Sequence, residues 1–266
     1  MANPNPLRQR EARSHIDELF GHPASVFVIH YACQSFRQDQ KMGSPRITAI
    51  AARNLGSGET ATFSIHVEAE LARLGPVRIL TLMDQLERAL LDKVFAFLKE
   101  NQKMRFVHWN MRDAVFGFPA IEHRYAVLGG TSAAIPEAHK TDLARTLVDI
   151  YGSGYVAAPF LESLAKLNGL ILTDFLAGDA EADAFERGNY LEVQRSTLTK
   201  VRLLFDILQL AHDRTLKSRA TWWTMNVGRV REAYEICVGN PLYAIGAAII
   251  TAIGVALKIL EYLGGK

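Results

Sequence analysis

An uncharged stretch near the C-terminal end constrains this chain more than any other feature of its sequence. The 22 residues Ile236–Leu257 carry no charged side chain, and a helix needs about 20 apolar residues to cross the hydrocarbon core of a bilayer. Tyr243 and Tyr262 lie near the two ends of the stretch, where amphipathic rings favour the headgroup region. The sequence therefore predicts a transmembrane helix over residues 237–263.

Basic residues are unequally distributed around this stretch. Only Lys258 and Lys266 follow it, and the segment 213–236 before it reads as a basic juxtamembrane helix or linker. The start of the chain, Met1–Arg13, is polar and shows no secretory signal. Positive charge favours the cytoplasmic side, so we expect a single-pass membrane protein with a cytoplasmic N-terminal domain. The preceding basic residues are Arg214, Lys217, Arg219, Arg229 and Arg231.

Small residues recur within the predicted membrane helix. A strip of small side chains lets helices approach each other closely in lipid, so the sequence predicts a homo-oligomer that associates through this strip. The alternative is a buried helix of a soluble core, since alanine and glycine are common there too. The residues of the strip are Ala244, Ala248, Ala252 and Ala256, with Gly246 and Gly254.

The composition of the chain is that of a globular protein. Its 266 residues are 49% hydrophobic and 22% charged, which excludes wholesale disorder. The formal net charge of +2 gives no overall case for nucleic-acid binding, which would need a local basic patch. Cys33 and Cys237 match no zinc-binding spacing, as is typical of a reducing compartment.

The order of predicted elements indicates an α/β domain over residues 25–212, after a polar N-terminal segment 1–24. Apolar runs and alternation predict strands at Val26–Tyr31, Arg46–Leu55, Thr60–Val67 and Phe106–Trp109. Helical spacing and capping residues predict helices at Ile79–Asn101, Asp113–Leu128, Thr141–Tyr151, Pro159–Leu167 and Leu191–His212.

Three strands, a helix, a fourth strand that leads into Asn110 and a helical half resemble the DEDD-type 3′–5′ exonucleases. The resemblance covers roughly residues 25–212 and implies a ribonuclease H-like mixed sheet with flanking helices. The stretches that carry it are Val26–Phe36 (VFVIHYACQSF), Phe106–Ala114 (FVHWNMRDA), Asp142–Leu176 and Gln194–Ile207 (QRSTLTKVRLLFDI).

The catalytic acids of that family do not carry over to this sequence. Tyr31-Ala32-Cys33 stands where the family has Asp-x-Glu, and Ala114 replaces the acid that follows Asn110. The third motif falls on Gln194 or Arg195, with Thr199 or Lys200. Because two-metal hydrolysis needs several carboxylates around two Mg²⁺ ions, we expect a degenerate nuclease site without a cofactor.

Polar residues at the ends of the predicted central strands form the candidate ligand site, since α/β folds place ligands there. The first hypothesis is a membrane-tethered binding or effector protein whose partner is a nucleotide, a single-stranded nucleic-acid end or a protein. A role in antiphage defence is suggested only by analogy with effectors that act at the membrane. A hydrogen-bonded strand end without a ligand is the alternative. The candidates are His30, Tyr31, Cys33, Gln34, His108, Asn110 and Asp113; among them His30, Cys33 and His108 could suit Zn²⁺, but four ligands are not evident, so no metal is predicted.

Two other functions remain open. One is an active Mg²⁺-dependent exonuclease that uses displaced acids, with Asp113, Asp142 and Asp149 as its catalytic candidates. The other is a soluble cytoplasmic scaffold whose final helix packs against its own domain. Further acids available to a displaced site are Asp39, Glu68, Glu70 and Glu122.

Overall fold

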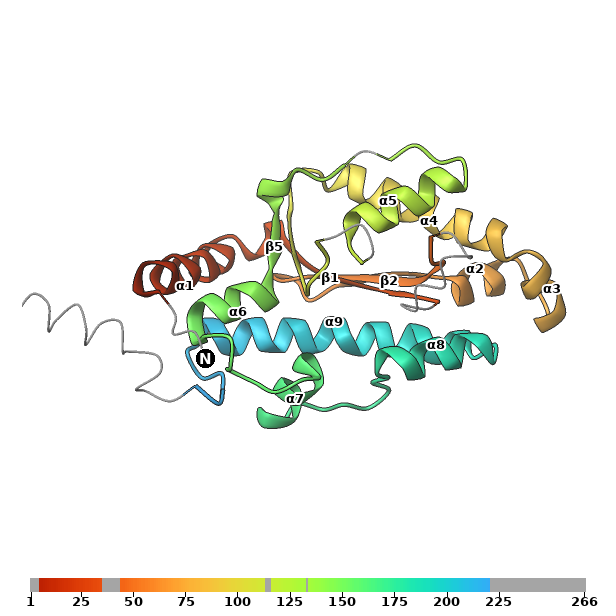
Figure 1. The fold of residues 1–266 in the computed structure, drawn as a ribbon. Coiled ribbons are helices and arrows are strands. Elements are labelled where there is room, and N and C mark those ends of the chain that lie inside the picture. The colour runs from red at the N-terminus through yellow and green to blue at the C-terminus, as the bar shows by residue number, and fades with distance from the viewer. Residues whose placement is uncertain (1–4, 35–43, 113–115, 133, 221–266) are drawn as a thin grey trace, which may run out of the picture.

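The computed structural model describes residues 5–34, 44–112, 116–132 and 134–220 (Figure 1). It has a mixed α/β fold with a five-stranded sheet and flanking helices, which confirms the fold class at that level. The sheet order is β3-β2-β1-β4-β5. The strands are β1 Val26–Cys33, β2 Ile47–Asn54, β3 Thr60–Ser64, β4 Arg105–His108 and β5 Lys140–Asp142.

Strand direction decides where the ends of the strands meet. β1, β2 and β3 form an antiparallel meander, while β4 pairs parallel to β1 and β5 pairs parallel to β4. The carboxyl ends of β1, β4 and β5 therefore share one edge of the sheet, which we call the carboxyl edge. The chain segments that leave this edge supply the walls of the candidate site.

One face of the sheet is covered by two amphipathic helices, α4 (Met83–Glu100) and α5 (Phe118–Val127) (Figure 1). Their apolar side chains bury Ile29 of β1 and Phe106 of β4. The helices α2 (Ile65–Leu71) and α3 (Pro76–Thr81) precede them in the chain.

The other face is covered by α1 (Pro6–Gly21), α6 (Leu143–Tyr151) and α9 (Tyr190–His212), with α7 (Phe160–Leu167) and α8 (Gly178–Glu186) alongside α9 (Figure 1). The polar stretch predicted before residue 25 thus contains a helix. Its Ile16 and Leu19 are fully buried beside α6 and α9. Two short 3-10 turns, Pro23–Ser25 and Glu137–His139, lead into β1 and β5.

The predicted strand Thr60–Val67 is wrong in its second half. β3 ends at Ser64, where helix α2 begins. The Ser64 hydroxyl accepts a hydrogen bond from the Val67 amide at 3.1 Å, which satisfies an N–H group that the first turn of a helix leaves without a partner. The alternation of Phe63, Ile65 and Val67 predicts a strand, but the serine cap starts a helix instead.

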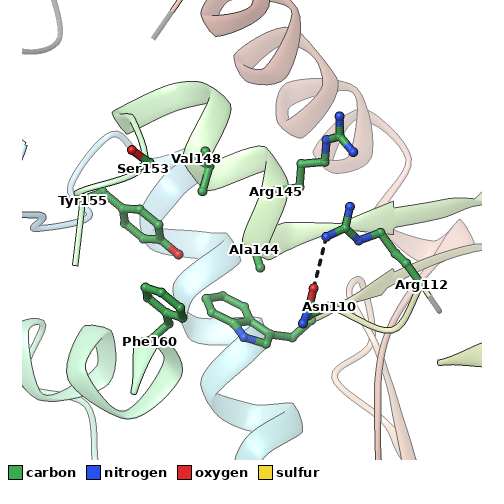
Figure 2. A pocket seen from close by; sticks show the side chains of 9 residues that line it. Asn110, Arg112, Ala144, Arg145, Val148, Ser153, Tyr155 and Phe160 are labelled. Carbon is green, nitrogen blue, oxygen red and sulfur yellow. Dashed lines mark hydrogen bonds between the residues drawn. The ribbon is translucent and has the colours of Figure 1, made fainter. Parts of the chain in front are cut away.

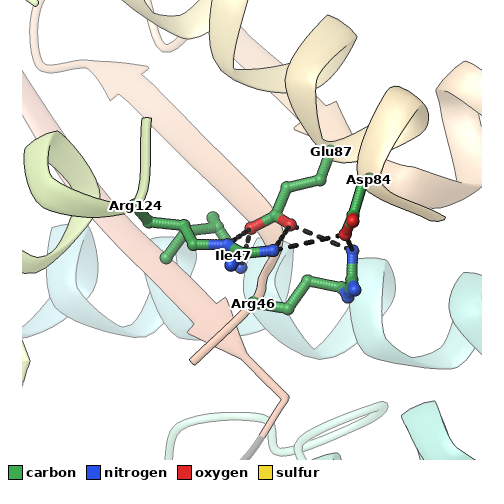
Figure 3. Close-up of polar contacts among 5 residues, drawn as sticks. All are labelled: Arg46, Ile47, Asp84, Glu87 and Arg124. Atoms are coloured by element: carbon green, nitrogen blue, oxygen red, sulfur yellow. Dashed lines mark hydrogen bonds and ion pairs between the residues drawn. The ribbon is translucent and has the colours of Figure 1, made fainter. Parts of the chain in front are cut away.

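A buried carboxylate ties the α4/α5 face to the start of β2 (Figure 3). Glu87 of α4 has no exposed side-chain surface, and its oxygens accept hydrogen bonds from the Ile47 amide at 2.7 Å, from Arg46 at 3.0 Å and from Arg124 at 2.6 and 2.9 Å. We call Glu87, Arg46 and Arg124 the Glu87 cluster. Each oxygen of this carboxylate therefore accepts two hydrogen bonds from the protein itself.

None of the helices in the described part of the chain is long and apolar enough to cross a bilayer. The predicted membrane helix 237–263, with its strip of alanines and glycines, lies outside that part. Only residues 213–220 of the predicted juxtamembrane stretch are described.

Candidate functional site

A pocket of about 440 Å³ opens at the carboxyl edge of the sheet, and we call it the aromatic pocket. Figure 2 shows Tyr155 and Phe160 on one side of it and Arg112 with Asn110 on the other. Tyr155 comes from the loop after α6, Phe160 begins α7, and the two polar residues follow β4. The full lining is Trp109, Asn110, Arg112, Ala144, Arg145, Val148, Ser153, Tyr155 and Phe160.

Asp142 holds the polar wall of the aromatic pocket, Asn110 and Arg112, in place. It is the N-cap of α6, in place of the predicted Thr141, and its Oδ1 accepts from the Ala144 amide at 3.1 Å. The same oxygen accepts from the Asn110 amide at 3.1 Å, and its other oxygen pairs with Arg112. Asn110 adopts a left-handed conformation with φ of 55°, which asparagine tolerates better than most residues. The turn after β4 is therefore held against the start of α6.

The aromatic pocket carries a net positive charge. Arg112 and Arg145 line it, and Asp142 neutralises the first of them. Arg145 has no ion-pair partner among the residues that the structure describes. Burial, with a smaller effect of the Asp142 carboxylate, raises the pKa of Tyr155, so its phenol stays neutral. The pocket combines aromatic surface with one uncompensated guanidinium group.

A second pocket of about 250 Å³ lies next to the first, since Trp109 and Phe160 line both. We call it the His30 pocket. His30 of β1 and Phe175 of the loop before α8 contribute to its walls. Glu181 of α8 and Lys200 of α9 lie at the same pocket.

Lys200 and Glu181 form a buried ion pair in the wall of the His30 pocket. Their side chains are 8% and 3% exposed, and Lys200 Nζ donates to Glu181 Oε2 at 2.7 Å. Ser196 donates to the other Glu181 oxygen at 2.7 Å. The ammonium lies 5.6 Å from the centre of the Phe175 ring. Charges are costly to remove from water, so this pair is an unusual feature for the wall of a pocket.

His30 is buried beside this pair, and its Nδ1 has no hydrogen-bond partner in the described part of the molecule. Burial, and secondarily the positive charge of Lys200, hold the pKa of His30 well below its ordinary value. The imidazole is therefore neutral at physiological pH. A neutral imidazole has one ring nitrogen that donates and one that accepts.

His108 faces away from His30. Strand alternation places His30 with Val28 on the α9 face, and His108 with Phe106 on the α4/α5 face. His108 meets the Phe118 ring edge-on at 5.6 Å. Its Nδ1 accepts from the Met111 amide at 3.2 Å. Burial, partly offset by Asp142, lowers its pKa to about 4. The sheet thus separates the two histidines that the sequence places in one cleft.

Tyr31 also points to the α4/α5 face. Its hydroxyl accepts from the Gly117 amide at 2.9 Å, and its ring stacks on Phe116 at 4.4 Å. Gly117 passes so close to the Met111 backbone that a Cβ atom would lie within 2.6 Å of it. This close approach leaves no room for a side chain at position 117. The hydrogen bond from its amide occupies the Tyr31 hydroxyl, so this interaction of Tyr31 is a structural one.

The remaining candidate residues are spread around the edge. Cys33 is buried in the core of the α4/α5 face, and the Gln34 amide donates to the Arg46 carbonyl at 2.9 Å. Asp113 lies outside the described residues. Of the seven candidates, His30, Tyr31 and Asn110 reach the two pockets.

The acids available for a displaced nuclease site do not converge in the described part of the chain. Asp142 caps α6, and Asp149 lies seven positions further along the same helix. Glu68 pairs with Lys93 at 2.7 Å, and Glu70 lies 3.4 Å from His66. Within the described ranges, no group of three or more His, Cys, Asp or Glu side chains is placed to hold a metal ion; Asp39 and Asp113 fall outside those ranges.

Several residues of the two pockets are absent from the sequence-based candidates. Trp109 and Arg112 lie close to Asn110 in the FVHWNMRDA stretch, so their nearness to a candidate residue could have predicted that they belong to the site. The sequence analysis considered Lys200 only as an alternative to Thr199 in the third motif of the exonuclease resemblance. Nothing in the local sequence indicates that Tyr155 and Phe160 would join them.

Comparison of the sequence with protein-family models finds no match, and comparison with curated proteins finds none either.

Proposed function

We propose that this chain is a membrane-tethered effector that binds a nucleotide or the end of a single-stranded nucleic acid. The observation that carries the proposal is the aromatic pocket, with three aromatic rings and two guanidinium groups around about 440 Å³. Aromatic rings stack on bases of any sequence, and guanidinium groups pair with phosphate through two parallel hydrogen bonds. The pocket offers both kinds of contact to one ligand.

The position of the pocket supports this ligand class. In open α/β sheets, ligands bind outside the carboxyl ends of the strands, and the aromatic pocket lies beyond the ends of β4 and β5. Its volume falls within the range of ordinary small-molecule sites.

The order of elements supports a degenerate relative of the DEDD-type exonucleases. Three strands, a group of helices, β4 followed by Asn110 and then a largely helical half follow one another as that resemblance implies. In that resemblance, Tyr31 and Cys33 stand where the first two acids would be, and Thr199 or Lys200 stands where the last one would be. These side chains cannot supply the negative charge that two Mg²⁺ ions require, so binding without hydrolysis is the function we propose.

The chain leaves the described domain beside the aromatic pocket, which supports coupling to the predicted membrane segment. The Arg219 amide donates to the carbonyl oxygen of Tyr155 at 2.7 Å. The side chain of Asn168, at the end of α7, donates to the Lys217 carbonyl at 3.0 Å and accepts from its amide at 2.7 Å. A ligand that moves Tyr155 or α7 would therefore act on the segment that follows, which is how we expect ligand binding to influence oligomerisation in the membrane.

Binding is tested with the full-length protein in detergent micelles. Fluorescence anisotropy with a labelled five-nucleotide single strand, and calorimetry with a mononucleotide, measure the two ligand forms. Arg145→Gln removes a guanidinium without breaking any ion pair within the described residues, so we expect at least a tenfold loss of affinity. Arg187→Gln replaces an exposed arginine that follows the last residue of α8 and lines neither pocket; it is the matched control and should bind as the wild type does.

The same experiment separates the alternatives. No binding of either probe, or equal binding by both variants, contradicts the proposed site. Mg²⁺-dependent release of mononucleotides that is lost in Asp142→Asn or Asp113→Asn would instead establish the displaced-acid exonuclease.

The membrane half of the proposal has its own test. Cell fractionation should leave the full chain in the carbonate-washed membrane pellet, and removal of residues 237–266 should release it. Full-length protein in the supernatant would favour the soluble scaffold. If expression is toxic, the same truncation should relieve the toxicity.

A further inference from the structure

We propose that residues 71–81, which comprise the end of α2, the turn that follows and α3, form a second membrane contact that binds an anionic lipid surface. We call these residues the α3 tip. The inference rests on the membrane half of the proposed function, because the predicted helix 237–263 is what would hold the domain beside a bilayer. It deepens that function by assigning the part of the domain that meets the lipid.

The first argument is exposed apolar surface. Val77, Leu80 and Leu71 are 75%, 66% and 66% exposed, and no other large apolar side chain in the described part of the chain is more exposed. Val77 and Leu80 lie three positions apart in α3, so they share one side of the helix. Scattered exposed apolar residues are ordinary, whereas clustered ones mark a contact with a partner or a membrane.

The α3 tip is anchored to the domain by its other apolar residues. Leu74 and Ile79 are half-buried and pack against the core of the α4/α5 face. The Leu74 amide donates to the Ala69 carbonyl at 3.0 Å, just past the end of α2. The chain thus uses two apolar residues of the tip for its own core and leaves three exposed on an ordered backbone.

The second argument is charge. The α3 tip contains Arg73 and Arg78 and no acidic residue. Both arginines are exposed, and neither has an ion-pair partner among the residues that the structure describes. The nearest acids in the sequence contact other groups: Glu70 lies 3.4 Å from His66, and Asp84 contacts the two arginines of the Glu87 cluster. Basic residues beside an apolar surface are attracted to anionic headgroups, so an anionic bilayer matches the tip.

The third argument is shape. Figure 1 shows α3 at the end of the domain opposite α1, where α4 is its neighbour. Residues of the α3 tip line none of the described pockets. A protein partner would need a hollow that matches this projecting surface, whereas a bilayer admits an amphipathic helix into its headgroup region. The shape therefore favours lipid over a protein or a second copy of the chain.

The fourth argument is the position of the tether. The described chain leaves the domain at the α1 end, where Arg214 pairs with Asp17 of α1 at 2.6 Å. From Ala220, 16 residues lead to the predicted helix at 237. Any 16 residues span at most about 55 Å, which exceeds the length of α9, roughly 35 Å for its 23 residues. The domain can therefore lie along the bilayer, with the tether at one end and the α3 tip at the other.

Two double variants separate the apolar contribution from the charged one. Val77→Ser/Leu80→Ser removes the apolar side chains, and Arg73→Gln/Arg78→Gln removes the two charges. All four side chains are exposed, and substitutions at exposed positions rarely disturb a fold.

The matched control replaces one exposed residue of each kind elsewhere. Val127→Ser/Arg187→Gln changes a valine at the end of α5 that is 56% exposed and an exposed arginine after α8. Neither residue belongs to the α3 tip.

The measurement is hydrogen–deuterium exchange of the full-length protein, followed by mass spectrometry in peptides that cover residues 71–81. The protein is compared in detergent micelles, in phosphatidylcholine nanodiscs and in nanodiscs that contain phosphatidylserine. We expect exchange in the α3 tip to be at least threefold slower in the phosphatidylserine discs than in detergent, with a smaller effect in phosphatidylcholine.

The variants should divide this effect. Val77→Ser/Leu80→Ser should abolish the slowing in both kinds of disc. Arg73→Gln/Arg78→Gln should reduce the slowing in phosphatidylserine discs to the level seen in phosphatidylcholine. The control variant should behave as the wild type does.

Three results contradict the lipid contact while leaving the tether intact: protein that inserts into discs with no slowing at the tip, slowing that survives Val77→Ser/Leu80→Ser, or slowing in detergent that grows with protein concentration. The last would show that a second copy covers the tip. A full-length chain that inserts into neither disc would instead overturn the membrane half of the proposed function, and this inference with it. Insertion and tip exchange are read separately, so the two failures are distinguishable.

Discussion

The two faces of the sheet each bury an ion cluster, and the clusters differ in how completely the protein satisfies them. In the Glu87 cluster, one carboxylate accepts four hydrogen bonds from Arg46, Arg124 and the Ile47 amide (Figure 3). On the opposite face, Glu181 accepts from Lys200 and Ser196, and His30 beside them has an unpaired nitrogen. The second cluster borders a pocket, and none of the described pockets is lined by Glu87.

This difference distinguishes a cluster with a purely structural role from one that is open to a further partner. A saturated buried cluster holds elements together and has nothing left to offer a ligand. An unsaturated cluster retains donors and acceptors without partners, although the free-energy cost of removing them from water has already been met when the chain folds. The comparison therefore assigns the Glu87 cluster on α4 and α5 to stability, and it leaves the edge between β1, α8 and α9 as the part of the sheet where the proposed ligand would bind.

The largest effect is expected from breaking the saturated cluster. Glu87→Ala leaves two guanidinium groups and a backbone amide without their buried acceptor, so it should lower the free energy of unfolding by about 5 kcal/mol. Urea denaturation followed by circular dichroism measures this change. Asp84→Ala removes a carboxylate that is 69% exposed but contacts the same two arginines, and it should cost less than about 1 kcal/mol. Similar losses for the two variants would contradict the structural role of Glu87.

Breaking the Lys200–Glu181 pair should lower the free energy of unfolding by a smaller amount, and a second substitution should restore most of the loss. Lys200→Met strands the buried Glu181 carboxylate and should cost about 3 to 4 kcal/mol, whereas the double variant Lys200→Met/Glu181→Gln removes both charges and should recover most of that loss. The same denaturation experiment completes the double-mutant cycle. A double variant that is as unstable as the single one would mean that the charge pair itself contributes to the fold.

The buried His108 on the α4/α5 face should make the stability of the protein depend on pH. The pKa of His108 is about 4 in the native state against an ordinary value of 6.5, so between these values the unfolded chain binds a proton that the native chain does not. Unfolding free energy should therefore fall by about 3 kcal/mol as the pH drops from 6.5 to 4.

His108→Asn keeps an acceptor for the Met111 amide and should flatten that part of the pH profile, as followed by thermal melts at each pH. His123→Asn, an exposed histidine on α5, should leave the profile unchanged. An unaltered slope in His108→Asn would show that other groups govern the acid sensitivity.

Local patterns predicted most of the secondary structure because they depend on neighbours in the chain. The apolar run at Val26 became β1, the stretch Arg46–Leu55 became β2, and Leu191–His212 became α9. The prediction was wrong at Ile65 and Val67, where a single serine hydroxyl decides between strand and helix. Helix α1 was not predicted, since only a few of its residues, including Ile16 and Leu19, are buried.

The candidate site was less predictable, because its parts come together from distant positions. His30 and Asn110 were identified from their places at strand ends, a rule that holds for any α/β sheet. Arg145, Tyr155 and Phe160 follow β5 and carry no local motif. Their meeting with Trp109 depends on how α6 and α7 return to the edge of the sheet.

The sequence by itself determined the periodicities: which stretches alternate, which are amphipathic, and which 22 residues lack any charge. Only the tertiary structure decided which of these surfaces face one another. It placed His30 and His108 on opposite sides of one sheet and joined Lys200 to Glu181 across two helices. The physical reason is that hydrogen bonding and side-chain alternation act between near neighbours, whereas burial and ion pairing depend on packing between segments that the chain order alone does not bring together.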